Sequence, residues 1–143
     1  MEKLKFDSGV REYDLGCGVL RFNPSDPNLY GRFLDAADEI GALEQELLQK
    51  AKAAAGDEGY VTVKLLVEAD RKMKALLQKV FIGNDFDALL GGVNLLAMAG
   101  NGQRLITNLL QALQPVLLKG AEDCAREKTE AAVKQARQRR EKQ

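Results

Sequence analysis

The fold is decided by residues 20–33, which read LRFNPSDPNLYGRF. Leu20 and Phe22 are spaced by two, as side chains on one face of a β-strand are, and the run NPSDP then ends the strand. Asp26 can cap the free backbone N–H groups of a helix. Pro27 fits the first helical position, because its missing N–H would go unused there. The stretch therefore predicts a strand that passes directly into a helix beginning at residue 27.

The residues before this point predict two more strands. Apolar residues alternate with others in both regions, and Asp7-Ser8-Gly9 and Gly16-Cys17-Gly18 have the composition of tight turns. We expect three short strands in an antiparallel β-meander within residues 1–22, at 3–7, 10–15 and 18–22. A sheet this small must pack against other elements to be stable.

The residues after residue 27 predict helices. Apolar side chains recur at steps of three and four over 27–55 and over 60–81, with charged side chains on the other side. This period indicates two amphipathic helices. The apolar stretch that follows is interrupted by several glycines, so we expect only short helical turns within 85–98, near 85–90 and 93–98.

The C-terminal third predicts a long helix in two parts. Residues 102–120 carry a regular apolar stripe, and Asn101 can cap their first turn. Pro115 removes one backbone hydrogen bond, so a kink or a restart is expected there. Residues 121–143 are rich in strong helix formers but have few large apolar side chains. They predict a basic helical C-terminal extension, partly or wholly free of a single domain formed by residues 1–120.

Composition agrees with one domain of the α+β class, mainly α. The chain has 143 residues, 45% hydrophobic content and no Trp, so its core must consist mostly of aliphatic side chains. Basic and acidic residues are equal at 21 each, with an acidic excess in residues 1–100 and a basic excess in 101–143. Cys17 and Cys124 have no partner pattern, and unpaired thiols fit a reducing cytoplasm. Neither a signal peptide nor a membrane span is expected.

The sequence offers no catalytic, cofactor or metal site. There is no histidine, which removes the commonest general base and the most frequent zinc ligand. The run Gly100-Asn101-Gly102-Gln103-Arg104 precedes a helix, but it lacks the Lys and Ser/Thr of a nucleotide-binding loop. We therefore expect a protein that binds other protein rather than an enzyme.

Two segments are candidate partner-binding regions. The apolar segment 81–98 is interpreted first as core that covers the helices, and second as a groove for an amphipathic partner helix. The candidate residues of that groove are Phe81, Ile82, Phe86, Leu89, Leu90 and Leu96. The basic C-terminal end is either a solvated helix end or a contact for an acidic partner, through Arg137, Arg139 and Arg140. No aromatic residue follows Phe86, so nucleic-acid binding is not expected.

Three segments carry a resemblance to a known family: residues 20–33, Val80-Phe81-Ile82-Gly83-Asn84-Asp85-Phe86, and the last helix with Leu113-Gln114-Pro115 and its Lys/Arg-rich end. Over nearly its whole length the chain resembles the tail assembly chaperone-like proteins of long-tailed phages and prophages of Gram-positive (Firmicute) bacteria. The resemblance implies binding of the tape-measure protein, or another tail protein, in the host cytoplasm. The alternative expectation is a structural phage or prophage protein that forms homo-oligomers, or an adaptor, acting through its C-terminal helix.

Overall fold

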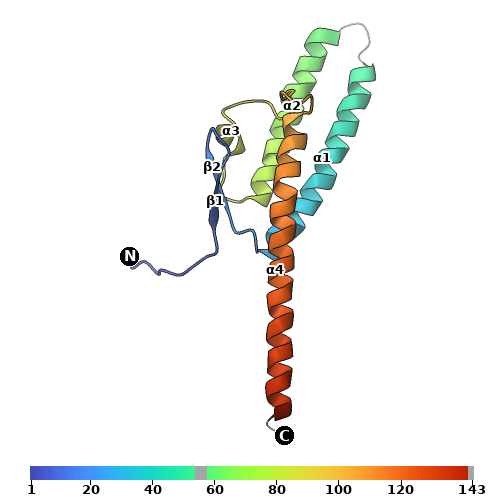
Figure 1. Cartoon of the computed structure of the whole chain (residues 1–143). Helices are drawn as coiled ribbons and strands as arrows, with labels where there is room; N and C mark the ends of the chain where they lie inside the picture. Colours follow the sequence, from blue (N-terminus) through green and yellow to red (C-terminus); the bar gives the residue numbers. More distant parts are fainter. Residues whose placement is uncertain (54–57, 142–143) are drawn as a thin grey trace.

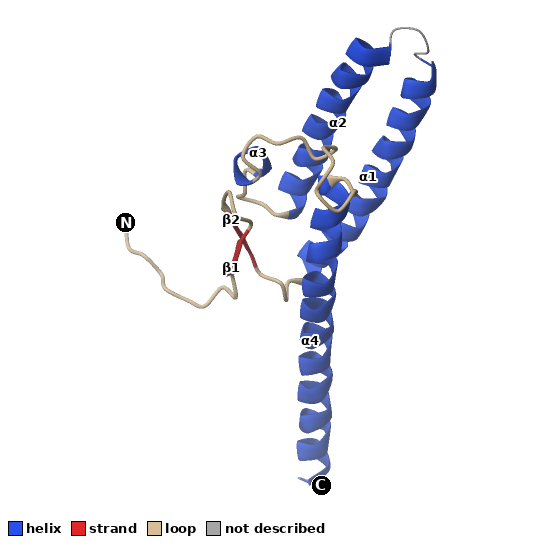
Figure 2. Ribbon diagram, turned by 45° about the horizontal axis from the view of Figure 1, so that its top comes forward, coloured by secondary structure: helices blue, strands red, loops and turns tan. Residues whose placement is uncertain are grey.

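The computed structural model describes residues 1–53 and 58–141. In this part of the chain a two-stranded antiparallel sheet is followed by helices (Figures 1 and 2). The elements, in order, are β1 (Arg11–Asp14), β2 (Val19–Phe22), α1 (Pro27–Ala53), α2 (Glu58–Val80), α3 (Phe86–Leu89) and α4 (Leu105–Glu141). The α+β class with mainly helical content is thus confirmed.

The two long helices α1 and α2 form an antiparallel pair, and the other elements pack near one end of that pair. The β-hairpin and α3 lie together on one side, α4 begins beside α1 and α2, and its C-terminal half extends away from the rest of the protein (Figure 1). Among the described helices none is long and apolar enough to cross a membrane.

The sheet has two strands where three were predicted. β1 and β2 correspond to the predicted strands 10–15 and 18–22, but the predicted strand 3–7 is wrong, since residues 1–10 form neither helix nor strand. The Asp7–Gly9 turn does not reverse the chain. Asn23 donates its side-chain amide to the backbone oxygen of Ser8 at 3.1 Å, which holds residue 8 next to the start of β1. The residues before it lead away from the sheet (Figure 1).

The predicted start of the first helix is confirmed. The side chain of Asp26 accepts a hydrogen bond from the N–H of Asn28 at 3.0 Å, and α1 begins at Pro27. Its predicted end at residue 55 lies outside the described residues. α2 covers most of the predicted helix 60–81, and α3 forms in the predicted turn 85–90. The second predicted turn, 93–98, is a hydrogen-bonded turn closed by Ala97 N–H on the oxygen of Asn94 rather than a helix.

The two predicted C-terminal segments are one helix. α4 continues through Pro115 without a restart, because the proline lies on the exposed side while Leu113 and Leu117 hold the helix to the core. The predicted cap is also wrong. The side-chain oxygen of Asn101 accepts from Gln103 N–H at 3.1 Å, and the helix begins only at Leu105.

The core lies where the hairpin, α1, α2, α3 and the first half of α4 meet. Phe81 is fully buried at its centre, with ring contacts to Phe22 (4.9 Å between centroids) and Phe86 (5.6 Å). The backbone of α4 also approaches the turn before α1 closely at Gly120, where a side chain would overlap Pro24. Helix α4 is therefore fixed against the start of α1, and its later residues extend from that point.

Candidate binding surfaces

An apolar hollow lies between the ends of α1 and α2 that are distant from the β-hairpin. We call it the hairpin groove, after the helical hairpin formed by α1 and α2; its volume is about 450 Å³. Its apolar wall comes from α1, α2 and the loop before α4, with Leu48 and Met98 largely open to solvent, at 50% and 65% exposure. The lining residues are Glu44, Gln45, Leu47, Leu48, Ala51, Thr62, Leu66, Leu96, Met98 and Arg104.

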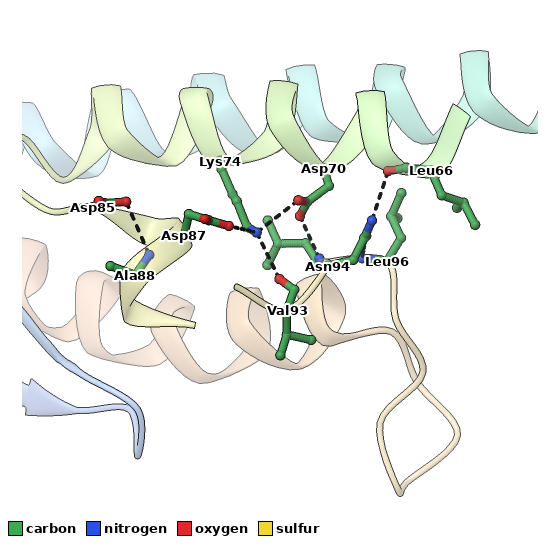
Figure 3. A network of polar contacts seen from close by, with 10 residues as sticks. Leu66, Asp70, Lys74, Asp85, Asp87, Ala88, Val93, Asn94 and Leu96 are labelled. Carbon is green, nitrogen blue, oxygen red and sulfur yellow. Dashed lines mark hydrogen bonds and ion pairs between the residues drawn. The ribbon is translucent and has the colours of Figure 1, made fainter. Parts of the chain in front are cut away.

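The loop that supplies Leu96 and Met98 is fixed to α2 by side chains (Figure 3). Asp70 accepts a hydrogen bond from Leu95 N–H at 2.8 Å, and Asn94 donates to the oxygen of Leu66 at 3.2 Å. The side-chain oxygen of Asn94 also accepts from Leu96 N–H at 2.8 Å. These contacts hold the loop against α2, so the wall of the groove that the loop forms is fixed in place.

The same part of α2 carries a buried cation. The ammonium of Lys74 lies 2.9 Å from a carboxylate oxygen of Asp70, 2.6 Å from one of Asp87, and 2.9 Å from the backbone oxygen of Val93 (Figure 3). Burial alone would lower the pKa of Lys74, but the hydrogen bonds and negative charges of Asp87 and Asp70 outweigh it and the pKa is raised. The group remains protonated at neutral pH, so it holds the loop and α3 and is unsuited to act as a nucleophile.

A second hollow on the α1–α2 surface measures about 420 Å³ and differs in character. Its large apolar side chains, Leu43 and Leu76, are partly buried and pack on the core. Its sides include Glu39, Lys72 and Lys79. Because the hairpin groove exposes more of its large apolar side chains, it is the better candidate for an apolar partner.

The structure places most of the predicted groove residues in the core. Phe81, Phe86, Leu89 and Leu96 are buried, and Leu90 is partly buried against them. The first interpretation of segment 81–98, that it is core, fits this arrangement. An open groove formed by these side chains is therefore not present, and Ile82 is the only member of the predicted set that is exposed, at 74%.

Of the predicted apolar residues, Leu96 lines the hairpin groove; the other lining residues were not predicted. Leu48 lies beside the apolar row of α1 and not in it. A large apolar residue outside the buried face of a helix was the signal that could have indicated this surface. Met98 gave no periodic signal, because its position depends on the loop's contacts with α2. Arg137, Arg139 and Arg140 are exposed near the end of α4, far from the groove along the helix.

Comparison with known proteins returns no matching family model, no matching curated protein and no matching solved structure.

Proposed function

We propose that this chain is a phage tail assembly chaperone-like protein that captures amphipathic helices of the tape-measure protein in the host cytoplasm, by binding and without catalysis. The observation that supports the proposal most is the hairpin groove. It combines an apolar floor, exposed Leu48 and Met98, and polar residues at its border, which is the pattern of a surface that receives the apolar face of a helix.

The groove suits reversible capture. Covering the exposed part of Leu48 contributes roughly 1 kcal/mol and Met98 a similar amount, at about 25 cal/mol per Å². Binding also loses translational and side-chain freedom, which offsets much of that gain. One helix is then held weakly, as a chaperone needs if the tape-measure protein is later to leave it for the growing tail.

The exposed end of α4 provides a second contact in this proposal. Every described side chain from Arg126 to Arg140 is exposed, and Arg137, Arg139 and Arg140 concentrate positive charge near the end of the helix. Such a charge would steer an acidic segment of the partner toward the chain, and it would act more on the association rate than on affinity.

Co-expression with the tape-measure protein tests the proposal. That partner is expected to be the long helical protein encoded immediately downstream. Leu48→Asp places a charge in the groove and should weaken capture at least about tenfold, a loss of about 1.4 kcal/mol. Leu34→Asp is the matched control, because Leu34 is also on α1 and is 46% exposed, but it does not line the groove.

The expected result is that the wild-type chain and Leu34→Asp keep the tape-measure protein soluble and Leu48→Asp does not. If the tape-measure protein is equally soluble without this chain, the proposal is wrong. If both variants lose capture equally, the groove is not the binding surface.

A structural role is the second candidate, favoured by the exposed half of α4. Val133 is 46% exposed there, and the helix extends away from the rest of the protein. Self-assembly through this helix predicts that the full chain scatters light as an oligomer and that a chain of residues 1–120 does not. Equal monomeric masses would exclude it.

A further inference from the structure

The outer edge of β1 presents unused backbone hydrogen-bonding groups. Leu15 N–H donates to the oxygen of Gly18 at 2.9 Å, so these two residues form a hydrogen-bonded pair. Because such pairs alternate along antiparallel strands, Tyr13–Leu20 is also one, and Glu12 and Asp14 direct their N–H and C=O groups away from β2. A strand could therefore bind along this edge.

The other edge of the sheet is already occupied by a side chain. Asn84 accepts a hydrogen bond from Arg21 N–H at 3.0 Å and donates one to the oxygen of Arg21 at 2.9 Å. Its carboxamide thus satisfies the outward backbone groups of Arg21, in the middle of β2, as a neighbouring strand would. Within the described residues the β1 edge has no equivalent seal, which makes it the site where strand addition is possible.

A hollow of about 360 Å³ lies beside the open edge, between the sheet and α4. Tyr13 and Arg11 border it from β1, and Val116 and Gly120 border it from α4. Tyr13 stacks on Phe22, so this is the face of the sheet that packs on the core. An apolar side chain on the same face of an added strand would enter the hollow.

The N-terminal arm, residues 1–10, has the pattern that this edge requires. Leu4 and Phe6 alternate with Lys3 and Lys5, and both apolar side chains are almost fully exposed, at 89% and 81%. If Leu4 and Phe6 face the hollow, the two lysines lie on the opposite face of the sheet.

On that opposite face Glu12 forms an ion pair with Arg21 of β2, and Asp14 is exposed beside it. Like charges directly across strands are unfavourable while opposite charges are favourable. A second β1 edge would bring further carboxylates next to Asp14. A strand that carries Lys3 and Lys5 would be attracted, so the charge pattern selects the arm as the occupant.

We infer that the N-terminal arm of one copy adds as a third strand to the β1 edge of a second copy, and that the exchange is reciprocal in a two-fold dimer. A copy's own arm does not lie along its own β1, because Asn23 holds Ser8 next to the start of the strand and the arm leads away from the sheet from there (Figure 1). The hollow shares no residue with the hairpin groove. The dimer is thus independent of tape-measure capture and can be tested with this chain alone.

Proline and alanine at residue 12 give a matched pair of variants. Glu12→Pro removes an N–H that points outward and is not used within the hairpin, which edge strands tolerate. Glu12→Ala keeps that N–H and removes the same exposed ion pair with Arg21. By light scattering, wild type should be a dimer. Glu12→Ala should raise the dissociation constant of that dimer at most about fivefold. Glu12→Pro should be a monomer with an unchanged circular dichroism spectrum.

Mixing variants tests which surfaces meet. Phe6→Asp disables the arm and Glu12→Pro disables the edge, so neither should dimerise alone. An equimolar mixture should form a mixed dimer, since the intact arm of the Glu12→Pro copy fits the intact edge of the Phe6→Asp copy. A wild-type chain that is monomeric at its highest attainable concentration would overturn the inference. A Glu12→Pro dimer, or a mixture that yields no mixed dimer, would overturn it too.

Discussion

Replacing Gly120 by alanine should destabilise the protein, although alanine is the better helix former. Gly120 is buried in the interior of α4. A methyl group there would overlap the carbonyl group of Pro24 and would lie 3.1 Å from Ser25 N. These are backbone atoms, and the turn is fixed because Ser25 N–H donates to the side chain of Asn23 at 2.9 Å. The overlap can be relieved only by moving α4 away from the start of α1.

The two opposing effects have different sizes. Alanine in place of glycine in a helix interior gains about 1 kcal/mol. Overpacking in a close contact costs about 1–3 kcal/mol, and contact with backbone belongs at the upper end. We expect a net loss of about 2 kcal/mol in the free energy of unfolding. With a slope of about 2 kcal/mol per M in urea, the midpoint should fall by about 1 M without a change in slope.

Gly41→Ala is the control, because Gly41 is also inside a helix, α1, and a methyl group there meets no atom within 4 Å. It should raise the free energy of unfolding by about 1 kcal/mol. Urea unfolding followed by circular dichroism measures both variants. If Gly120→Ala stabilises the protein as Gly41→Ala does, the close contact between α4 and Pro24 is not present and the reasoning is refuted.

Three further outcomes are expected. Lys74→Met should lower the free energy of unfolding by about 2–3 kcal/mol, measured in urea, because it leaves Asp70 and Asp87 without their cation; a loss below about 0.5 kcal/mol would contradict this. Burial lowers the pKa of Lys74, but hydrogen bonds to Asp87 and Asp70 raise it above its ordinary value of 10.5. The stability that Lys74 contributes should therefore be complete below pH 10.5, and it should be lost as the pH rises through the folded-state pKa. The Lys74→Met variant should lack that part of the alkaline loss in pH-dependent urea midpoints. Asn84→Ala should cost about 1–2 kcal/mol, since it uncovers the backbone groups of Arg21, and amide exchange at Arg21 should rise; unchanged exchange would show that Asn84 does not seal the strand.

The long helices could be predicted because their signals are local. The cap at Asp26, Pro27 at the first helical position and the apolar period of α1 all lie within the helix or next to it. The effect of Pro115 could not be predicted, for the opposite reason. Whether a helix continues past one lost hydrogen bond depends on what its neighbours pack against, and Leu113 and Leu117 are held by residues distant in the sequence.

The site could be predicted less well, because burial of an apolar loop is decided by contacts across the fold. The segment 81–98 contains both the centre of the core, Phe81, and the most exposed of the large apolar side chains that line the groove, Met98. The sequence shows the two as similar apolar residues. What separates them is Asp70 and Asn94, whose hydrogen bonds fix the loop on α2, and neither residue belongs to a recognisable motif.

The bond between Asn84 and Arg21 has a consequence for the nascent chain. The two residues are 63 positions apart, so at about 5–20 residues per second the ribosome needs roughly 3 to 13 seconds to make the second after the first. An isolated two-stranded hairpin is marginally stable at best, and Leu20 and Phe22 have no core to enter until Phe81 has also been made. The first element to be synthesised is thus among the last to pack into the core, and a chain stalled before residue 81 would leave its N-terminal apolar residues exposed.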